Sequence, residues 1–316
     1  MMTNKPIQLG NRIHLIDGFD LGMEKRTGTY VIEEENITLI ETGPSPSIPY
    51  VLSGLKDLSI NPDKIDYIIV THIHLDHAGG AGVLLKECPN AKLVVHPRGA
   101  RHIVDPLRLI QGAKAVYGDD FDRLFAPIIP VPEDKVIIKN DGDTLQIGPN
   151  CTLSFLDTPG HSDHHFSIYD PISNGIFTGD TIGVNYGPSL NDSNVQLYLP
   201  STSPNQFDPD KMLQSLERIQ NLQVDQIFFG HFGKSHDVHE VYKQIQYWLP
   251  LFMSLGEEAF EQHQDHIWLS GKLIHLVKSF LQQHIQDDHE VYKIIQLDMT
   301  VSAMGILHYF EKNEIS

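Results

Sequence analysis

Three histidines and one aspartate lie within six positions, in the run THIHLDH at residues 71–77. Neutral imidazole is the commonest metal-binding side chain. The run follows an apolar, strand-like segment, and residues two apart on an extended chain project to the same side. The spacing therefore predicts that His72 and His74 close on one metal ion. After a bend in the chain, Asp76 and His77 can close on a second ion.

Isolated histidines are weak evidence for a metal site, because this chain contains 18 of them. Two histidines separated by one residue also occur often by chance. The complete H-x-H-x-D-H pattern directly after an apolar strand is much rarer. It favours a metal site over a set of unrelated structural histidines.

Three later strand-like segments each end in a small-residue turn that carries a further candidate ligand. The segment CTLSFLD leads to His161, GIFT leads to Asp180, and QIFF leads to His231. Functional side chains on loops held by a rigid scaffold follow this arrangement. Two ions need more than four protein ligands, and these residues can supply them.

The motifs THIHLDHAGG, TPGHSDHH, FTGD and FFGHF resemble those of metallo-β-lactamase-fold hydrolases, and among them the glyoxalase II-like branch. The resemblance covers about residues 10 to 235, with the metal-binding motifs in order. It implies an α/β (α+β) fold, a four-layer αββα sandwich, and two divalent ions of zinc, iron or manganese. It also implies the ligands: His72, His74 and His161 for the first ion, Asp76, His77 and His231 for the second, and Asp180 as a bridge between them.

Two further positions bear on the resemblance. His165 matches a histidine that supports the ligands in the family, whereas Glu41 stands where the family usually has Asp. The FTGD motif also argues against β-lactam hydrolysis, since the zinc β-lactamases lack a bridging aspartate of this kind.

Composition limits the class of protein. A chain of 316 residues can bury a large core and form a second domain. Its net charge of −18 and the lack of a basic run oppose nucleic-acid binding. No apolar stretch is long enough to span a bilayer, and the N-terminus has no apolar signal core. Cys88 and Cys151 are too few for a disulfide framework. We expect a cytoplasmic protein with a small-molecule substrate; its oligomeric state stays open.

The hydrophobic pattern predicts strands mixed with helices, which favours a layered α/β domain. Strands are expected at 13–16, 29–33, 37–41, 66–70, 92–96, 136–138, 145–147, 151–157 and 166–170, and helices at 50–58, at 82–87 and within 97–127. Residues 236–312 have a helical pattern throughout. We therefore predict a catalytic domain at 1–235 and a C-terminal helical subdomain at 236–316. That subdomain is either a structural brace or a lid over the substrate pocket.

One sequence similarity lies within the helical region. DVHEVYKQIQ at 237–246 and DDHEVYKIIQ at 287–296 agree at eight of ten positions. We interpret them as two similar helix starts rather than as metal sites at His239 and His289, because acidic residues suit a helix N-terminus.

The expected chemistry follows from the two ions. A water that bridges two divalent ions loses its proton far more readily than bulk water. The metal-bridging hydroxide would attack an ester-like carbonyl or a phosphorus centre. The candidate catalytic residues are Asp76, which can pass a proton to the leaving group, and Asp180, which the resemblance places between the two ions. We predict hydrolysis of a small ester or thioester, because the quinolone-signal thioesterase group is similar in length, ligand spacing and C-terminal helices.

A lactonase or a phosphodiesterase is the nearest alternative. Lactone-hydrolysing relatives place a Tyr three residues after the bridging Asp, where this chain has Gly183, and the nearest tyrosine is Tyr186. Glyoxalase II itself has a basic glutathione-binding patch, of which only Lys272 and Lys278 are candidates here.

Two alternatives come from other functional classes. A mononuclear iron dioxygenase on the same scaffold would need only His72, His161 and Asp180, and the intact second ligand set argues against it. A binding or regulatory protein that retains its metals would keep every ligand, so the ligands alone do not separate it from an enzyme.

Overall fold

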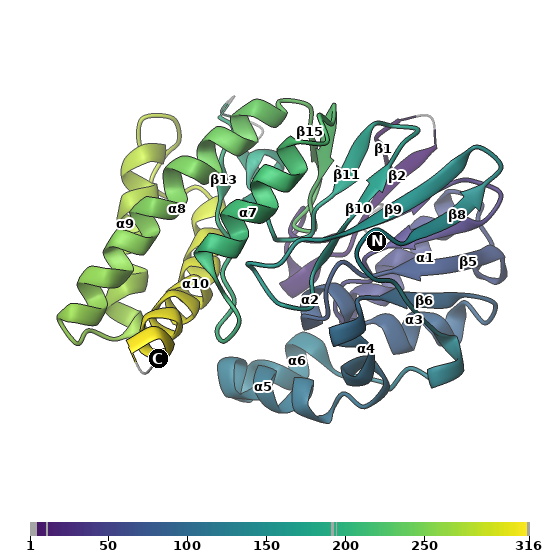
Figure 1. Ribbon diagram of the computed structural model, residues 1–316, viewed down its shortest axis with the longest axis horizontal. Helices are drawn as coiled ribbons and strands as arrows, with labels where there is room; N and C mark the ends of the chain where they lie inside the picture. Colours follow the sequence, from purple (N-terminus) through teal and green to yellow (C-terminus); the bar gives the residue numbers. More distant parts are fainter. Residues whose placement is uncertain (1–4, 11, 191–192, 194, 315–316) are drawn as a thin grey trace. The chain divides into compact units, whose positions relative to one another are not determined.

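The computed structural model of the chain describes residues 5–10, 12–190, 193 and 195–314 (Figure 1). The chain divides into two compact units. Unit 1 comprises Met1–Asp157, His164–Gly179 and Val224–His236, and unit 2 comprises Thr158–Asp163, Asp180–Gln223 and Asp237–Ser316. The division into domains at residue 235 remains a prediction.

Unit 1 holds most of the strands and the shorter helices. Its strands are β1 (Ile7–Gln8), β2 (Ile13–Asp17), β3 (Gly28–Ile32), β4 (Ile37–Ile40), β5 (Ile65–Ile69), β6 (Lys92–Val95), β7 (Val136–Ile138), β8 (Thr144–Gly148), β9 (Cys151–Asp157), β10 (Phe166–Asp170), β11 (Gly175–Phe177), β14 (Gln226–Phe228) and β15 (Lys234–Ser235). Its helices are α1 (Ile48–Asp57), α2 (Leu75–Ala78), α3 (Ala81–Glu87), α4 (Pro97–Val104), α5 (Leu107–Tyr117) and α6 (Phe121–Phe125).

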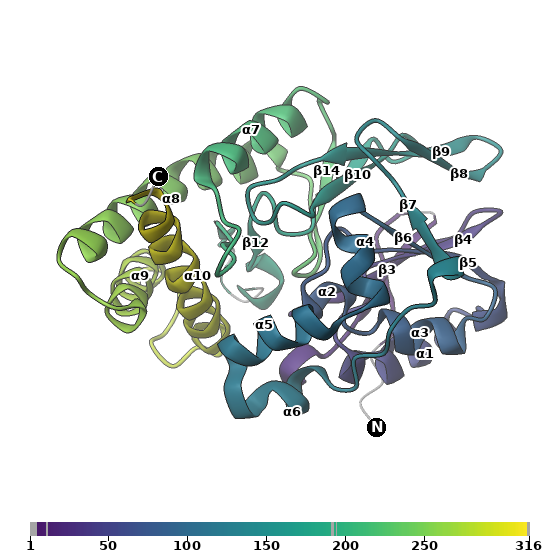
Figure 2. The same cartoon turned by 60° about the horizontal axis from the view of Figure 1, so that its bottom comes forward.

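These strands form two sheets. The first has the order β1-β2-β3-β4-β5-β6-β7, antiparallel from β1 to β4 and parallel from β4 to β7. The second has the order β15-β14-β11-β10-β9-β8, in which β11 and β14 are parallel. Parallel neighbours need crossover connections, and α1 and α3 supply two of them. Figure 2 shows both helices along the sheet that contains β4 and β5.

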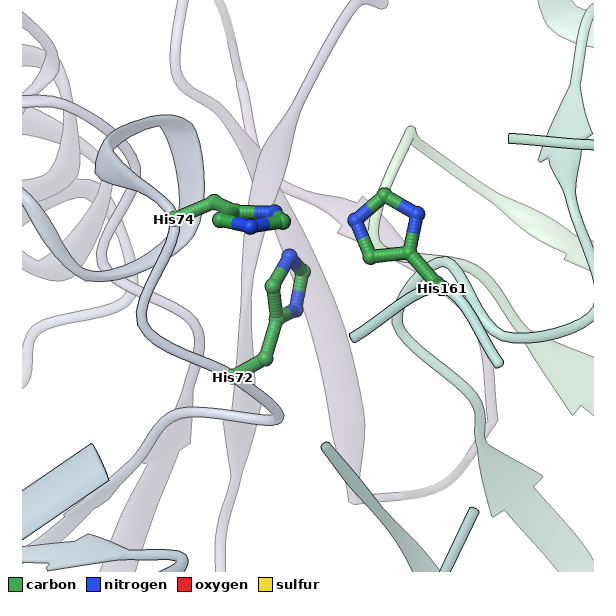
Figure 3. Close-up of side chains that lie close together, drawn as sticks. All are labelled: His72, His74 and His161. Atoms are coloured by element: carbon green, nitrogen blue, oxygen red, sulfur yellow. The ribbon is translucent and has the colours of Figure 1, made fainter. Parts of the chain in front are cut away.

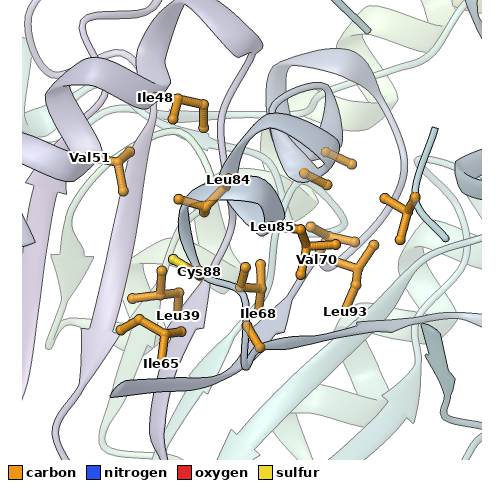
Figure 4. Packing of buried hydrophobic residues seen from close by; sticks show 14 of the residues in the cluster. Leu39, Ile48, Val51, Ile65, Ile68, Val70, Leu84, Leu85, Cys88 and Leu93 are labelled. Atoms are coloured by element: carbon orange, nitrogen blue, oxygen red, sulfur yellow. The ribbon is translucent and has the colours of Figure 1, made fainter. Parts of the chain in front are cut away.

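The residues of β5 alternate between two hydrophobic cores. Ile68 packs in a cluster with Val51 of α1 and Leu84 of α3 (Figure 4). Its neighbour Ile69 belongs to a cluster with Phe155 of the second sheet. Successive side chains of a strand point to opposite faces. The first sheet of unit 1 is therefore covered by helices on one face and by the second sheet on the other.

The predicted strands and helices of this part of the chain are confirmed, with boundaries within two residues. The region 97–127, expected to be helical, contains α4, α5 and α6. One boundary differs for a physical reason. Glu41, the last residue of the strand predicted at 37–41, has a φ of 67° and ends the extended conformation. Its side chain thereby turns away from the strand pattern and is buried.

Unit 2 is mainly helical. It contains β12 (Val184–Asn185), β13 (Tyr198–Leu199), α7 (Pro209–Gln220), α8 (Val238–Glu261), α9 (His266–Leu281) and α10 (Val291–Glu314). β12 and β13 pair as a two-stranded antiparallel ribbon. One cluster of buried residues joins Leu199 and Met212 to Phe252 of α8, Leu273 of α9 and Ile306 of α10. The helical pattern after residue 236 is confirmed, and these helices share a core with the segment 180–223.

The two similar decapeptides do lie at helix starts. Asp237 caps α8 by accepting a hydrogen bond from the amide of Glu240 at 3.2 Å. The Val-Tyr pair of each copy is buried at the beginning of its helix, in α8 and in α10. The shared residues therefore form the buried side of two helix N-termini, as interpreted from the sequence.

Within the described part of the chain, no helix combines the length and the apolar character needed to cross a membrane. Residues 1–4 and 11 of the N-terminal segment considered above lie outside the described residues.

Candidate metal centre

The end of β5 delivers a cluster of imidazole rings in unit 1. His72 and His74 lie in the segment between β5 and α2, and their ring centroids are 4.6 Å apart at an interplanar angle of 86°. The ring of His77, on α2, lies 4.1 Å from that of His72. Figure 3 draws His72 and His74 with ring nitrogens turned toward each other, and it also labels His161, which belongs to unit 2.

These rings present ligand atoms at distances suited to a shared ion. His72 offers a ligand atom within 4.8 Å of one on His74, and likewise with His77. Asp76, His77 and His231 form a three-residue group within the same limit. In that group the Oδ2 atom of Asp76 lies 3.4 Å from Nε2 of His231 and 3.7 Å from Nε2 of His77. Imidazole and carboxylate donors fit a divalent ion such as zinc, iron or manganese.

The turn that carries His231 is fixed by Tyr30 of β3. The buried hydroxyl of Tyr30 lies 2.6 Å from the carbonyl oxygens of both Phe229 and Gly233, on either side of the histidine. Burial raises the pKa of Tyr30 well above its ordinary value, so the hydroxyl keeps its proton and can donate. A rigid strand thereby positions a ligand on a tight turn.

Glu41 and Thr71 determine which nitrogen His72 presents. The backbone amide of Thr71 donates to Oε1 of Glu41 at 3.3 Å, and the Thr71 hydroxyl donates to the same oxygen. A hydroxyl has only one proton to give. The 3.1 Å contact between Thr71 Oγ1 and Nδ1 of His72 therefore has the ring donating. This leaves the lone pair of Nε2 for a metal ion.

His77 is held in the same manner. Its carbonyl accepts a hydrogen bond from the amide of Thr42 at 2.9 Å, and the Thr42 hydroxyl lies at the same distance from that carbonyl. Its Nδ1 atom lies 3.5 Å from Oε2 of Glu41, which turns Nε2 toward Asp76. Glu41 therefore contacts one candidate ligand, His77, directly and a second, His72, through Thr71.

A buried ion pair lies near the second group. Arg26 donates from Nε to Oδ2 of Asp20 at 3.2 Å, and both side chains are buried. Burial raises the pKa of Asp20 to about 6; the charge of Arg26 opposes this rise, whereas the charge of Asp76 adds to it. The sequence analysis missed this pair, because it lies in a loop between two ordinary strands with no motif around it.

Unit 2 brings His161 and Asp180 together. The Nε2 atom of His161 lies 3.8 Å from Oδ2 of Asp180. Nδ1 of His161 donates to the carbonyl of Ser201 at 3.0 Å, and the Ser201 hydroxyl donates to Oδ2 of Asp180 at 3.1 Å. Ser201, which the sequence analysis also missed, contacts both predicted ligands and turns Nε2 of His161 toward the carboxylate.

Of the seven predicted ligands, five therefore gather in unit 1 and two in unit 2. The unit 1 ligands are His72, His74, Asp76, His77 and His231. His165 also belongs to unit 1, and its ring stacks on that of His72 at 5.0 Å. The two groups of ligands are each assembled from loops at the ends of strands, as the sequence predicted.

Comparison with known proteins identifies the family. Residues 26–231 match the Metallo-beta-lactamase superfamily. This match covers more than half of the chain, and the chain therefore belongs to that superfamily. Its members are usually dinuclear metal hydrolases, and the His and Asp groups described above fit a metal site. Membership of the glyoxalase II-like branch within the superfamily remains a prediction.

Three relatives illustrate the range of the family. The metallo-beta-lactamase fold-containing protein ST1585 from Sulfurisphaera tokodaii is 28% identical over 225 residues, which is 70% of this chain and 78% of the relative. Diflavin flavoprotein A 1 from Synechocystis is 25% identical over 73% of this chain, and the alignment covers 39% of that longer protein. An N-acyl homoserine lactonase from Bacillus thuringiensis is 27% identical over 57% of this chain and 61% of its own.

The solved structure of ST1585 has a TM-score of 0.65 with this chain at 23% identity, and the match covers 96% of this chain and 99% of the other. At this identity the likeness shows the fold alone. The chain therefore has the metallo-β-lactamase fold, as the motifs implied, together with a C-terminal helical region, as the hydrophobic pattern predicted.

Proposed function

We propose that this protein is a dinuclear metal-dependent hydrolase that acts on a small ester or thioester. The observation that carries the proposal is the intact group of Asp76, His77 and His231, whose ligand atoms lie within 4.8 Å of one another. A site for one ion would not need this group in addition to His72 and His74. Two bound divalent ions would supply Lewis acidity and lower the pKa of a water held between them.

The chain connections between the two units support the proposal that the candidate ligands of both units belong to one metal centre. Asp180 directly follows Gly179 of unit 1. Gly179 has a φ of 49°, and a Cβ there would lie 2.5 Å from Nε2 of His165 and would also clash with Thr71. Consecutive Cα atoms are about 3.8 Å apart. Asp180 is therefore tethered beside the imidazole cluster of unit 1.

His161 is tethered in a similar way. It lies three residues before His164, which unit 1 contains and whose ring centroid is 5.3 Å from that of His74. Three residues of extended chain span at most about 11 Å. On this basis we propose that His161 would join His72 and His74 in holding the first ion, and that Asp180 would contribute to holding both.

The protein residues then have separate tasks. The imidazoles and Asp180 would hold the ions, while Glu41, Thr71 and Ser201 orient the ring nitrogens and the carboxylate. During hydrolysis the oxygen of water bonds to the carbonyl carbon, and the bond to the alcohol or thiol breaks. Asp76 receives the proton from the attacking water and passes it to the leaving group.

A lactone is the second candidate substrate, and the similarity to an N-acyl homoserine lactonase favours it. One observation distinguishes this chain from the lactone-hydrolysing pattern. The Tyr186 side chain is buried, and its hydroxyl donates to Asp298 of α10 at 2.7 Å. This favours a structural role for Tyr186, and it is the reason that an ester or thioester remains the first choice, with phosphodiesters as a further possibility.

The partners follow from charge and site chemistry. The net charge of −18 disfavours nucleic acid as a substrate. We propose a small-molecule substrate and a cytoplasmic location.

Metal analysis together with a substrate panel tests the proposal. Elemental analysis of the purified protein is expected to give two equivalents of zinc, iron or manganese per chain. Aryl esters, acyl thioesters, N-acyl homoserine lactones and bis-aryl phosphodiesters would then be compared by kcat/KM, with His231→Ala as the matched inactive control. A single equivalent of iron with uptake of oxygen would instead identify a mononuclear oxygenase. Two metals without turnover of any substrate would favour the binding or regulatory protein.

A further inference from the structure

The segment Ser201–Ser203, between β13 and α7, contacts both candidate ligands of unit 2. The backbone carbonyl of Ser201 accepts a hydrogen bond from the ring of His161, and the Ser201 hydroxyl donates one to the carboxylate of Asp180. The hydroxyl of Ser203 donates a hydrogen bond to the backbone carbonyl of His161 at 2.6 Å. Ser201 and Ser203 therefore fix the ring orientation and backbone of His161 and the carboxylate of Asp180.

Helix α10 packs against this segment. The hydroxyl of Thr202 donates to the carbonyl of Ser302 in α10 at 2.8 Å, and both residues are buried. One turn further on, the backbone of Gly305 lies against the segment. A Cβ at Gly305 would lie 2.5 Å from the carbonyl oxygen of Ser203 and 2.6 Å from the hydroxyl of Thr202. Only glycine permits this close approach without displacing one of the two elements.

Helix α8 holds the strand that leads into the segment. The side-chain oxygen of Gln244 accepts from the amide of Tyr198 in β13 at 2.9 Å, and its nitrogen donates to the carbonyl of Gln196 at 3.0 Å. Gln244 is one of the two positions at which the similar decapeptides differ, since the second copy has Ile294 there. The glutamine thus gives the α8 copy a polar contact that the α10 copy lacks.

We infer that Ser201 is a positioning residue for the metal centre. We also infer that the close packing of α10 at Gly305 fixes the segment Ser201–Ser203 and thereby the positions of His161 and Asp180. The C-terminal helices would then tune metal affinity directly, in addition to any effect on substrate. The inference rests on the proposed dinuclear function. Residues that orient metal ligands by hydrogen bonding typically change metal affinity about 10–100-fold when removed.

Ser201 supplies the first test. Ser201→Ala removes the hydroxyl that binds Asp180 but keeps the carbonyl that binds His161. We expect this variant to hold zinc about 10–100-fold more weakly than the native protein in competition with a chelator of known affinity. Ser201→Thr keeps the hydroxyl and, at this half-buried position, is expected to restore native affinity. A change in the visible spectrum of the cobalt-substituted Ser201→Ala protein would report the altered ligand geometry.

Gly305 supplies the second test. Gly305→Ala is expected to weaken zinc binding by a similar factor, because its methyl group pushes the segment away from α10. Gly271→Ala is the matched control: the same change is made in α9, where a Cβ would meet nothing within 4 Å. Leu273→Ala, in the shared core, controls for general loss of stability, and it is expected to lower the melting temperature of the metal-free protein without changing zinc affinity.

The outcomes are distinct. Native zinc affinity in Ser201→Ala would overturn the inference. If Gly305→Ala does not fold, the comparison of Ser201→Ala with Ser201→Thr decides the question alone. Weak zinc binding in Leu273→Ala equal to that in Ser201→Ala would also overturn it, since the loss would then follow stability and not ligand position. A native protein that binds fewer than two ions would refute the proposed function, whereas two ions with no effect of Ser201 refute only the inference.

Discussion

The Oε2 atom of Glu41 lies 3.5 Å from Nδ1 of His77, while its Oε1 atom accepts hydrogen bonds from Thr71. One buried carboxylate therefore supports candidate ligands of two different ions, His77 directly and His72 through Thr71. The positive φ of Glu41 is what turns its side chain to this position. The Glu41 side chain thus reaches both His77 and Thr71 from one backbone position.

Glu41→Ala is expected to lower kcat/KM by about 10–100-fold, because Glu41 acts on the ions only through the ligands it orients. Asp180→Ala is expected to lower it further, since Asp180 would touch both ions. Steady-state kinetics with the best substrate of the panel, at saturating metal, compares the two variants. Native activity in Asp180→Ala, or a greater loss in Glu41→Ala, would contradict the roles assigned to them.

Thr71 links Glu41 to His72, and its hydroxyl is the group that does so. Thr71→Val keeps the shape of the side chain but removes the hydroxyl, so we expect zinc affinity to fall about 10–100-fold. Thr71→Ser, which keeps the hydroxyl, is expected to remain within about threefold of the native protein. Chelator competition measures both. Equal zinc affinity in the valine and serine variants would rule out the link.

The candidate ligands could be predicted from the sequence because each lies within eight residues after the end of a strand. The strand pattern locates the edge of the sheet, and the residue type after it identifies a donor. His72, His74 and His77 illustrate this, since one local run determines their spacing: His72 and His74 precede helix α2, and His77 lies on it. The family resemblance then added the assignment of ligands to two ions.

The supporting residues could not be predicted, because their contacts join distant parts of the chain. Ser201 meets His161 across 40 residues, and Thr202 meets Ser302 across 100. No pattern in the sequence marks either pair, as serine and threonine in loops are common and usually solvated. The grouping of residues 180–223 with the C-terminal helices has the same origin, since it depends on a core that forms only when distant segments meet.

Removal of bound metal is expected to destabilise the protein. Ions that bind only the folded state stabilise it by about 2.7 kcal/mol when free metal is 100 times Kd. Melting curves with zinc at this excess and after dialysis against a chelator should therefore differ by several degrees. His231→Ala, which lacks one ligand of the second ion, is expected to show a smaller difference. Identical melting temperatures with and without metal in the native protein would contradict a metal centre in the folded chain.

Removal of residues 237–316 is expected to abolish metal binding as well as activity. α8, α9 and α10 share one core with Leu199 and Met212, so their loss would expose the segment that holds Ser201. Zinc content and circular dichroism of the truncated protein provide the measurement. A folded truncated protein that retains two ions would refute this expectation. If its substrate preference were also altered, that result would favour the proposal that the helices act as a lid.

Asp17 makes stability depend on pH. Its carboxylate accepts hydrogen bonds from the amides of Phe19 and Lys25, at 2.9 and 2.7 Å, and it is buried at the end of β2. Burial is the main effect and raises the pKa of Asp17 from 3.8 to about 6, against the lowering effect of the two amides. As pH rises from 4 to 6, the unfolded chain therefore loses this proton before the folded chain does. The folded state consequently loses stability over this range, by up to about 3 kcal/mol.

Asp17→Asn removes this titration while keeping a similar shape. The free energy of unfolding of the native protein, minus that of Asp17→Asn, is therefore expected to increase as pH falls from 7 to 4, with most of the change below pH 6. Urea unfolding at several pH values measures the difference, and other titrating groups cancel because both proteins contain them. Asp143→Asn is the control: hydrogen bonds donated by Asn140 lower the pKa of the Asp143 carboxyl, so the difference should decrease toward pH 4. A constant difference for Asp17→Asn would show that the buried carboxyl group does not bind its proton more tightly in the folded state.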